Sequence, residues 1–133
     1  LQIRSIEKIL KKLKIEHKLQ SYFENIYEVL NLSDLVIARS GAGTINDIII
    51  SQVPSIVVPL PHSIYNHQYE NGKYLEENNA CILIQEKEIY LKKTYIKFKE
   101  LIDNKEKRSI LINNLQSIKV LDANKIMLKK IFK

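Results

Sequence analysis

The stretch that decides the fold is Asp-Leu-Val-Ile-Ala-Arg-Ser-Gly-Ala-Gly-Thr-Ile-Asn-Asp, residues 34–47. Residues 35–37 form a short apolar run, which is typical of a parallel strand covered on both faces. The Gly-Ala-Gly of residues 41–43 predicts a tight turn, because glycine adopts backbone angles closed to other residues. A helix then opens near Thr44 and presents unpaired N–H groups at the positive end of its dipole. The arrangement favours a bound phosphate, although a strand–glycine–helix turn can also exist only for close packing.

The composition predicts one ordered globular domain. A chain of 133 residues can bury one moderate core, and 45% apolar residues with three Gly and three Pro argue against disorder. We expect neither a membrane-spanning segment, which needs about 20 consecutive apolar residues, nor a signal peptide. Cys81 is the only cysteine, which excludes disulfide frameworks and cysteine-rich zinc sites and fits a reducing cytoplasm. Its apolar neighbours predict a small, buried strand residue.

The net charge of +6 is unevenly spread along the chain. Residues 1–20 carry a net charge of +4 and residues 86–133 one of +7, whereas residues 21–85 carry −5. A nucleic-acid-binding protein places basic and aromatic side chains together at its site. Here the candidate site lies in the acidic middle, so no nucleic-acid partner is expected. Two explanations remain for the basic ends. They could contact an anionic membrane surface, or they could reflect only a compositional bias of the chain towards Lys, Ile and Asn.

Hydrophobic periodicity predicts helices and strands that alternate along the chain. The first element is an amphipathic helix over residues 5–15, with Ile6, Ile9 and Leu13 on its apolar face. The others are a strand over 17–23, a helix over 25–32, a strand over 34–38, a helix over 44–52, a strand over 55–58, a stiff loop over 59–66, a helix over 67–78, a strand over 81–84, and two or three helices, the last around Met127. This alternation predicts an α/β fold with a parallel sheet. Ligands bind at the carboxyl ends of such strands, so the loops 39–43 and 59–66 should converge.

The second of these loops carries the other informative motif. It reads Pro-Leu-Pro-His-Ser-Ile-Tyr-Asn-His-Gln over residues 59–68, and Asn71 follows one turn later. Together with Arg-Ser-Gly-Ala-Gly-Thr over residues 39–44, it resembles the carboxyl-terminal domain of the MurG family of bacterial glycosyltransferases. The resemblance extends over the whole chain and is strongest over residues 20–80. Either motif alone is a weak signal, but both in this order and spacing are specific.

The resemblance implies a Rossmann-like parallel sheet with flanking helices, the carboxyl-terminal half of a two-domain GT-B glycosyltransferase. Members of this family are inverting enzymes that move N-acetylglucosamine (GlcNAc) from UDP-GlcNAc onto lipid I. The product, lipid II, serves peptidoglycan synthesis, and the enzymes act in the cytoplasm at the inner face of the plasma membrane. Residues 1–133 would be the UDP-sugar-binding domain, with its first strand or strands and the acceptor domain for lipid I outside the chain.

The resemblance also implies which residues would bind the uracil base. The backbone of Phe23 would read the hydrogen-bonding edge of uracil. Tyr22 and Tyr27 lie close to it in the sequence. We expect all three aromatic side chains to serve packing rather than to form a platform on which the base stacks.

For the rest of the nucleotide, the resemblance implies that Ala42, Gly43 and Thr44 lie against the diphosphate. Asp47 stands where the family has an acidic residue, usually Glu, that accepts hydrogen bonds from the ribose hydroxyls. Because Asp is one methylene shorter, it would reach one hydroxyl or act through water. The alternative for Asp47 is a carboxylate in the first helical turn that only complements the helix dipole.

For the sugar, the resemblance matches His67 and Gln68 with a polar pair that contacts the GlcNAc ring. His67 could equally be an exposed residue at the start of a helix. Arg39 could neutralise phosphate charge or pin the turn by bonding carbonyl groups, and His62 could contact the ligand or hold its own loop. The further candidates for donor binding are thus Arg39, Ser40, Gly41, His62 and Asn71.

The chain holds no residue to which we assign the catalytic base, because the family's candidate histidine lies in the domain outside it. The three histidines, at 17, 62 and 67, lack suitably spaced partners, so we expect no metal site, and no cofactor is implied. Catalytic help would come from stabilising the diphosphate and positioning the sugar. Two other readings remain: a UDP-GlcNAc-binding subunit of a two-subunit transferase acting on another polyprenyl-diphosphate lipid, and a non-catalytic nucleotide-binding remnant.

Overall fold

The fold is seen in a computed structural model that describes residues 2–118. Its centre is a parallel sheet of three strands in the order β1 (Val36–Ala38), β2 (Ser55–Val57) and β3 (Ile82–Leu83). The register pairs Ile37 with Ile56 and Val57 with Leu83. Because all three strands run the same way, their carboxyl ends lie at one edge of the sheet.

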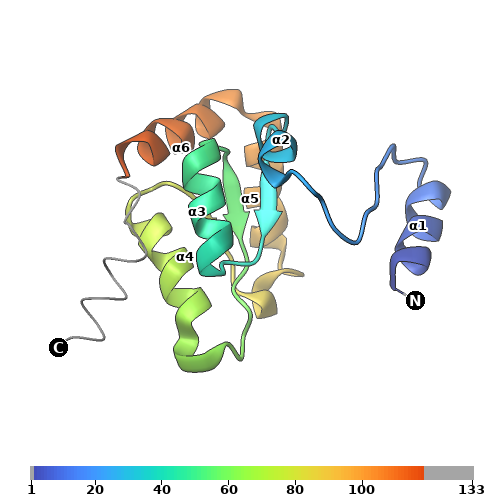
Figure 1. Cartoon of the computed structure of the whole chain (residues 1–133), viewed down its shortest axis with the longest axis horizontal. Helices are drawn as coiled ribbons and strands as arrows, with labels where there is room; N and C mark the ends of the chain where they lie inside the picture. Colours follow the sequence, from blue (N-terminus) through green and yellow to red (C-terminus); the bar gives the residue numbers. More distant parts are fainter. Residues whose placement is uncertain (1, 119–133) are drawn as a thin grey trace.

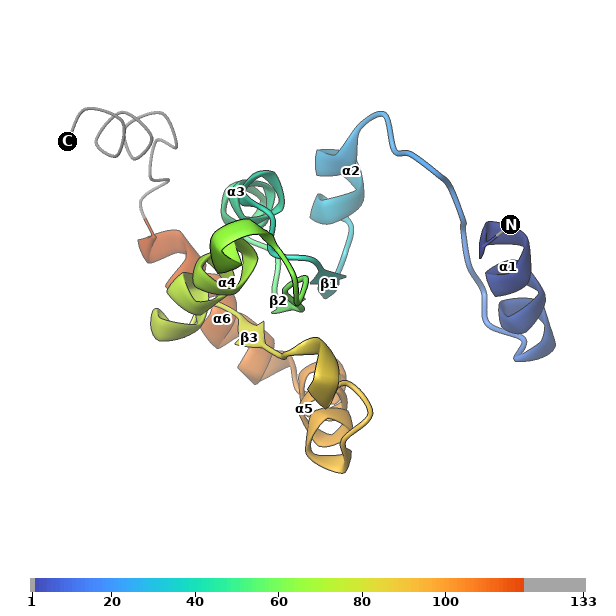
Figure 2. The same ribbon diagram turned by 90° about the horizontal axis from the view of Figure 1, so that it is seen from below.

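Helices connect and cover the strands (Figure 1). On one face lie α3 (Ala42–Ser51), which joins β1 to β2, and α4 (His67–Glu77), which joins β2 to β3 after the short 3₁₀ turn η1 (Ile64–Asn66). Figure 2 shows α5 (Lys92–Asp103) on the opposite face. The remaining elements of the body are α2 (Ile26–Asn31), the 3₁₀ turn η2 (Glu86–Glu88) and α6 (Lys105–Ser117).

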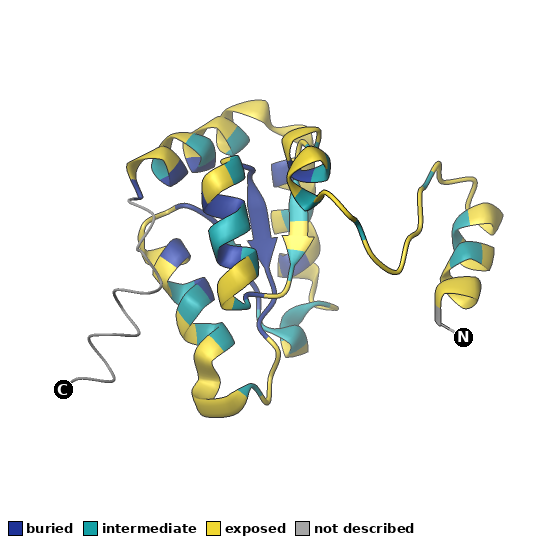
Figure 3. Ribbon diagram, viewed as in Figure 1, coloured by how far each residue is buried: buried dark blue, intermediate teal, exposed yellow. Residues whose placement is uncertain are grey.

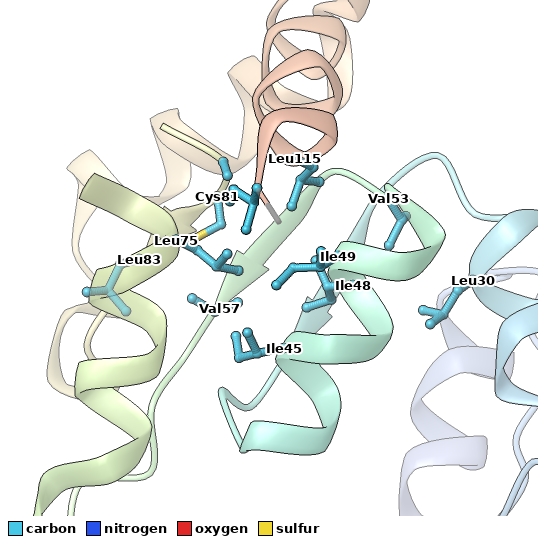
Figure 4. Close-up of a cluster of buried hydrophobic side chains, with 12 residues drawn as sticks. Leu30, Ile45, Ile48, Ile49, Val53, Val57, Leu75, Cys81, Leu83 and Leu115 are labelled. Atoms are coloured by element: carbon cyan, nitrogen blue, oxygen red, sulfur yellow. The ribbon is translucent and has the colours of Figure 1, made fainter. Parts of the chain in front are cut away.

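The core consists of two apolar clusters, one on each face of the sheet. The cluster between the sheet, α3 and α4 includes Ile48 and Leu75, which are fully buried (Figure 4). The cluster on the other face includes Ile56 of β2 and Leu101 of α5. Side chains alternate between the two faces of a strand, so Ile56 and its neighbour Val57 enter opposite clusters. After the buried Ser55, residues 56–58 in and just beyond the central strand are therefore all apolar, as expected for a strand covered on both sides.

The alternation of helices and strands predicted for residues 25–84 is confirmed, with boundaries that shift by up to two residues. The expected burial of Cys81 is also confirmed, although it directly precedes β3, and this burial raises the pKa of its thiol to about 12. Within the described residues, the α-helices after β3 are α5 and α6. The last helix, expected around Met127, lies outside the described residues.

The predicted strand over residues 17–23 is wrong. The structure forms neither helix nor strand there, and the segment leads from the first helix to α2 as an extended connection. A strand is stable only when a neighbour satisfies its backbone hydrogen bonds. In the described part of the chain, β1 pairs only with β2, so this segment has no strand beside it.

The first helix, α1 (Gln2–Lys12), is present but lies three residues earlier than the predicted range of 5–15, and it stands apart from the α/β body (Figures 1 and 3). Its apolar face is exposed, with 46% of Ile6 and 57% of Ile9 accessible to solvent. Periodicity thus identified the helix but not a partner for it. Within residues 2–118, no helix is both long and apolar enough to cross a membrane.

Candidate functional site

The loops after β1 and β2 converge at the carboxyl edge of the sheet, as the sequence predicts. Ser40, in the first loop, is fully buried, and its hydroxyl donates to the backbone carbonyl of Gln68 at 2.7 Å. The side-chain amide of Asn71 donates in turn to the carbonyl of Ser40 at 3.1 Å. These two hydrogen bonds hold the β1–α3 loop against the start of α4, and we call them the Ser40 clamp.

The amino end of α3 is open. Gly41 is its N-cap, with φ −62° and ψ 153°, and its carbonyl accepts the first hydrogen bond of the helix, from Ile45 at 2.9 Å. No side chain within residues 2–118 caps this end, so the N–H groups of Ala42, Gly43 and Thr44 have no hydrogen-bond partner there. Unpaired N–H groups at a helix start, with the dipole behind them, attract an anion.

The expectation that the Gly-Ala-Gly turn uses special backbone angles is wrong. None of the chain's three glycines has a positive φ, and Gly41 is in an extended conformation that any residue adopts. The reason is that α3 already begins at Ala42, so the turn is a simple N-cap. A Cβ added to Gly43 would meet no atom within 4 Å. The absent side chain therefore leaves free space beside the open helix end.

Asp47 lies in the second turn of α3, because the helix begins at Ala42 rather than at Thr44. The dipole effect fades beyond the first turn, so the alternative reading of Asp47 as a dipole-complementing residue loses its basis. Its Oδ1 accepts a hydrogen bond of 2.8 Å from the hydroxyl of Tyr27. This hydrogen bond, aided by the negative charge of Asp47, raises the pKa of Tyr27 above its usual value.

Tyr27 is a residue that sequence reasoning missed. The expected packing role is wrong for Tyr22, which is 75% exposed, whereas Tyr27 is 40% exposed and also uses its hydroxyl to bond Asp47. Phe23 is half-buried on the loop before α2. No sequence signal links Tyr27 to Asp47, since the two are 20 residues apart and meet only through the packing of α2 on α3.

Gln68 joins both loops to the start of α4. Its Oε1 accepts from the backbone N–H of Leu60 at 2.9 Å, and its own N–H donates to the hydroxyl of Ser63 at 3.3 Å. The Nε2 group of Gln68 has no partner within residues 2–118 and keeps its two N–H donors. His67 beside it is exposed, and its ring lies edge-on to that of Tyr65, with centroids 5.7 Å apart.

Arg39 is engaged by the protein itself. Its Nη1 donates to the carbonyls of Val58 and Pro59, at 3.3 and 3.2 Å, and forms an ion pair of 2.6 Å with Glu86. These contacts favour the role of pinning the turn over that of neutralising phosphate. His62 is exposed on the second loop. Within residues 2–118, no three His, Cys, Asp or Glu side chains gather as a metal site would need.

Gly72 in α4 is a second residue that sequence reasoning missed. A Cβ there would lie 2.8 Å from Cδ1 of Leu83 and 3.1 Å from Cγ2 of Val57, so only glycine lets α4 approach the sheet this closely. A Cβ would also lie 3.5 Å from Cβ of Ser40, which places Gly72 directly beneath the clamp. A glycine inside a helical pattern was the available signal.

Comparison with known proteins agrees with this geometry. The model of the glycosyltransferase family 28 C-terminal domain matches residues 2–125. A UDP-N-acetylglucosamine–N-acetylmuramyl-(pentapeptide) pyrophosphoryl-undecaprenol N-acetylglucosamine transferase of Thermoanaerobacter sp. (strain X514) is 36% identical over 124 residues, which are 88% of this chain and 34% of the relative. The protein of the same name from Rickettsia prowazekii (strain Madrid E) is 37% identical over 101 residues, covering 76% and 26%.

A solved structure shares the fold. The crystal structure of Acinetobacter baumannii MurG superposes with a TM-score of 0.78 over 87% of this chain and 34% of that chain, at 20% identity. The chain spans between a quarter and about a third of the length of these curated relatives, 26% and 34%. The family resemblance predicted from the two loops is therefore confirmed. With its three-stranded parallel sheet and flanking helices, the chain belongs to the glycosyltransferase family 28 C-terminal domain family and has the fold of the carboxyl-terminal half of MurG, a GT-B enzyme.

Proposed function

We propose that this chain binds UDP-GlcNAc as the donor-binding part of an inverting glycosyltransferase that moves GlcNAc onto lipid I to form lipid II. The observation that carries the proposal is the open amino end of α3, held by the Ser40 clamp against the start of α4. The curated relatives with more than 30% identity are named as N-acetylglucosamine transferases. Their names support the choice of sugar and acceptor, and the open end of α3 supports a site for the diphosphate.

The diphosphate would lie at the open end of α3. The N–H groups of Ala42, Gly43 and Thr44 would donate to its oxygens, and the free space beside Gly43 would let them approach the backbone. During transfer, negative charge develops on the departing UDP. Fixed N–H donors and a helix dipole stabilise that charge without having to reorganise, which lowers the barrier.

The two ends of the donor would be held by neighbouring elements. Asp47, one turn further along α3, would accept a hydrogen bond from the ribose. On the other side, the free Nε2 group of Gln68 and the exposed ring of His67 would contact GlcNAc hydroxyls at the start of α4. Because the Ser40 clamp joins these two elements, it would fix the distance between the diphosphate and the sugar.

The rest of the reaction would depend on groups that we do not assign to this chain. Deprotonation of the acceptor hydroxyl requires a base, and lipid I requires an acceptor domain near the membrane. The basic residues of α1 would suit the anionic inner surface of a bacterial plasma membrane.

Isothermal titration calorimetry of the full chain tests the donor-binding role. UDP should bind more tightly than ADP, because only a pyrimidine presents the edge that the Phe23 backbone would read. Both nucleotides carry the same diphosphate, so ADP is the matched control for the contribution of α3. Equal affinities for UDP and ADP would contradict the proposal.

A further inference from the structure

The pair formed by Tyr27 and Asp47 is the feature of the site that the donor-binding role leaves unexplained. Tyr27 comes from α2 and Asp47 from the second turn of α3, and their side chains meet at 2.8 Å. The pair lies at the surface, since Tyr27 is 40% exposed and Asp47 is half-buried. Asp47 also belongs to α3, the helix whose amino end would receive the diphosphate.

A purely structural role explains this pair poorly. The two helices are already joined by Leu30 of α2, which is buried in the same cluster as Ile45 and Ile48 of α3. A hydrogen bond at the surface adds little to such a contact, because both partners would otherwise bond to water. The stability of the fold therefore does not require the phenolic hydroxyl.

The chemistry of the pair suits a diol. An ionised carboxylate only accepts hydrogen bonds, and the Tyr27 hydroxyl already occupies Oδ1 of Asp47. Oδ2 has no partner within residues 2–118 and remains free to accept. A phenolic oxygen that donates its proton still has lone pairs, so Tyr27 can accept as well. The pair thus presents two adjacent acceptors, and the vicinal hydroxyls of a ribose are two adjacent donors.

We propose that Tyr27 completes the ribose subsite: it holds Asp47 in place and accepts a hydrogen bond from one ribose hydroxyl while Asp47 accepts from the other. This inference rests on the proposed UDP-binding role. It resolves the difficulty that Asp47 is too short to bind both hydroxyls by itself. The hydrogen bond also orders the carboxylate before the nucleotide arrives, which reduces the entropic cost of binding.

The test compares three ligands on the full chain by calorimetry: UDP, 2′-deoxy-UDP and 3′-deoxy-UDP. Tyr27→Phe keeps the ring and removes only the hydroxyl. It should weaken UDP binding by about 5- to 10-fold, the usual effect of losing one hydrogen bond. For the analogue that lacks the hydroxyl bound by Tyr27, the substitution should cost less affinity than for UDP, because only the ordering of Asp47 is then lost.

Tyr22→Phe is the matched control, because Tyr22 is an exposed tyrosine five positions earlier to which we assign no contact with the donor. It should leave all three affinities unchanged. An unchanged affinity of Tyr27→Phe for UDP, or an equal loss for all three ligands, overturns the role of Tyr27 alone. A wild-type chain that binds none of the three overturns the donor-binding role and this subsite with it. Thermal unfolding within about 2 °C of the wild type would show that the variant is folded.

Discussion

Two helical glycines have opposite surroundings in this protein. Gly43 borders free space at the open end of α3, whereas Gly72 faces the side chains of Leu83 and Val57. A methyl group therefore fits into free space at the first position, whereas at the second it would displace the side chains of Leu83 and Val57. Gly43 would thus leave room for a ligand, whereas Gly72 allows α4 to pack closely on the sheet.

Alanine at each position tests this contrast. Gly43→Ala should change the free energy of unfolding by less than about 1 kcal/mol but weaken UDP binding, since the methyl group would enter the space proposed for the diphosphate. Gly72→Ala should cost about 1–3 kcal/mol of stability through overpacking, more than the gain of about 1 kcal/mol in helix propensity. Urea unfolding and calorimetry measure the two effects. Unchanged UDP affinity in Gly43→Ala would place the diphosphate elsewhere.

At the scale of elements, the site depends on how α3 and α4 are joined. Both helices begin at the carboxyl edge of the sheet, but the strands and helices alone do not set the distance between the start of α3 and the start of α4. The Ser40 clamp does, through one buried hydroxyl and one amide. A buried hydrogen bond between two elements is more costly to lose than an exposed one, because its remaining partner cannot turn to water.

Ser40→Ala should therefore lower the free energy of unfolding by about 1–2 kcal/mol and also weaken UDP binding, because the two loops would no longer be held in register. Ser109→Ala is the matched control, since the exposed hydroxyl of Ser109 only bonds back to the carbonyl of Lys105 within α6. It should leave both quantities unchanged. A Ser40→Ala variant that is less stable but binds UDP normally would show that the clamp does not position the donor.

At the scale of the whole molecule, α1 is the exception to a well-packed structure. The α/β body buries apolar residues on both faces of its sheet, whereas α1 exposes its apolar face and is connected by an extended segment (Figures 2 and 3). Hydrophobic stabilisation is proportional to the apolar area removed from water. The helix therefore contributes little to the stability of the body.

Replacing both Ile6 and Ile9 with Gln should change the free energy of unfolding of the body by less than about 0.5 kcal/mol. Ile48→Ala, by comparison, should cost about 2–5 kcal/mol, because Ile48 is fully buried and its truncation leaves a cavity. Urea unfolding followed by circular dichroism measures both. A cost above 1 kcal/mol for the double variant would mean that the apolar face of α1 packs in solution.

The particular successes and failures of sequence reasoning have one physical origin. The meeting of the loops 39–43 and 59–66 was predictable, because parallel strands place their carboxyl ends at one edge. The prediction of a strand over residues 17–23 was wrong, because a local sequence pattern does not show whether a neighbouring strand is there to pair with it. The roles of Ser40 and Gly72 also depend on close contacts between α4 and the sheet, and no local pattern encodes such contacts.

The sequence by itself determined the α/β class, the order of the elements over residues 25–84, the family, and the two loops that form the edge of the site. These follow from local properties: the period of apolar residues, the conformational limits of Gly and Pro, and motifs with a set spacing. Only the tertiary structure decided that α3 begins uncapped at Ala42, that Arg39 bonds carbonyls, and that Tyr27 reaches Asp47. Those outcomes depend on how whole helices and loops pack together. That packing is determined by many residues that lie far apart in the chain.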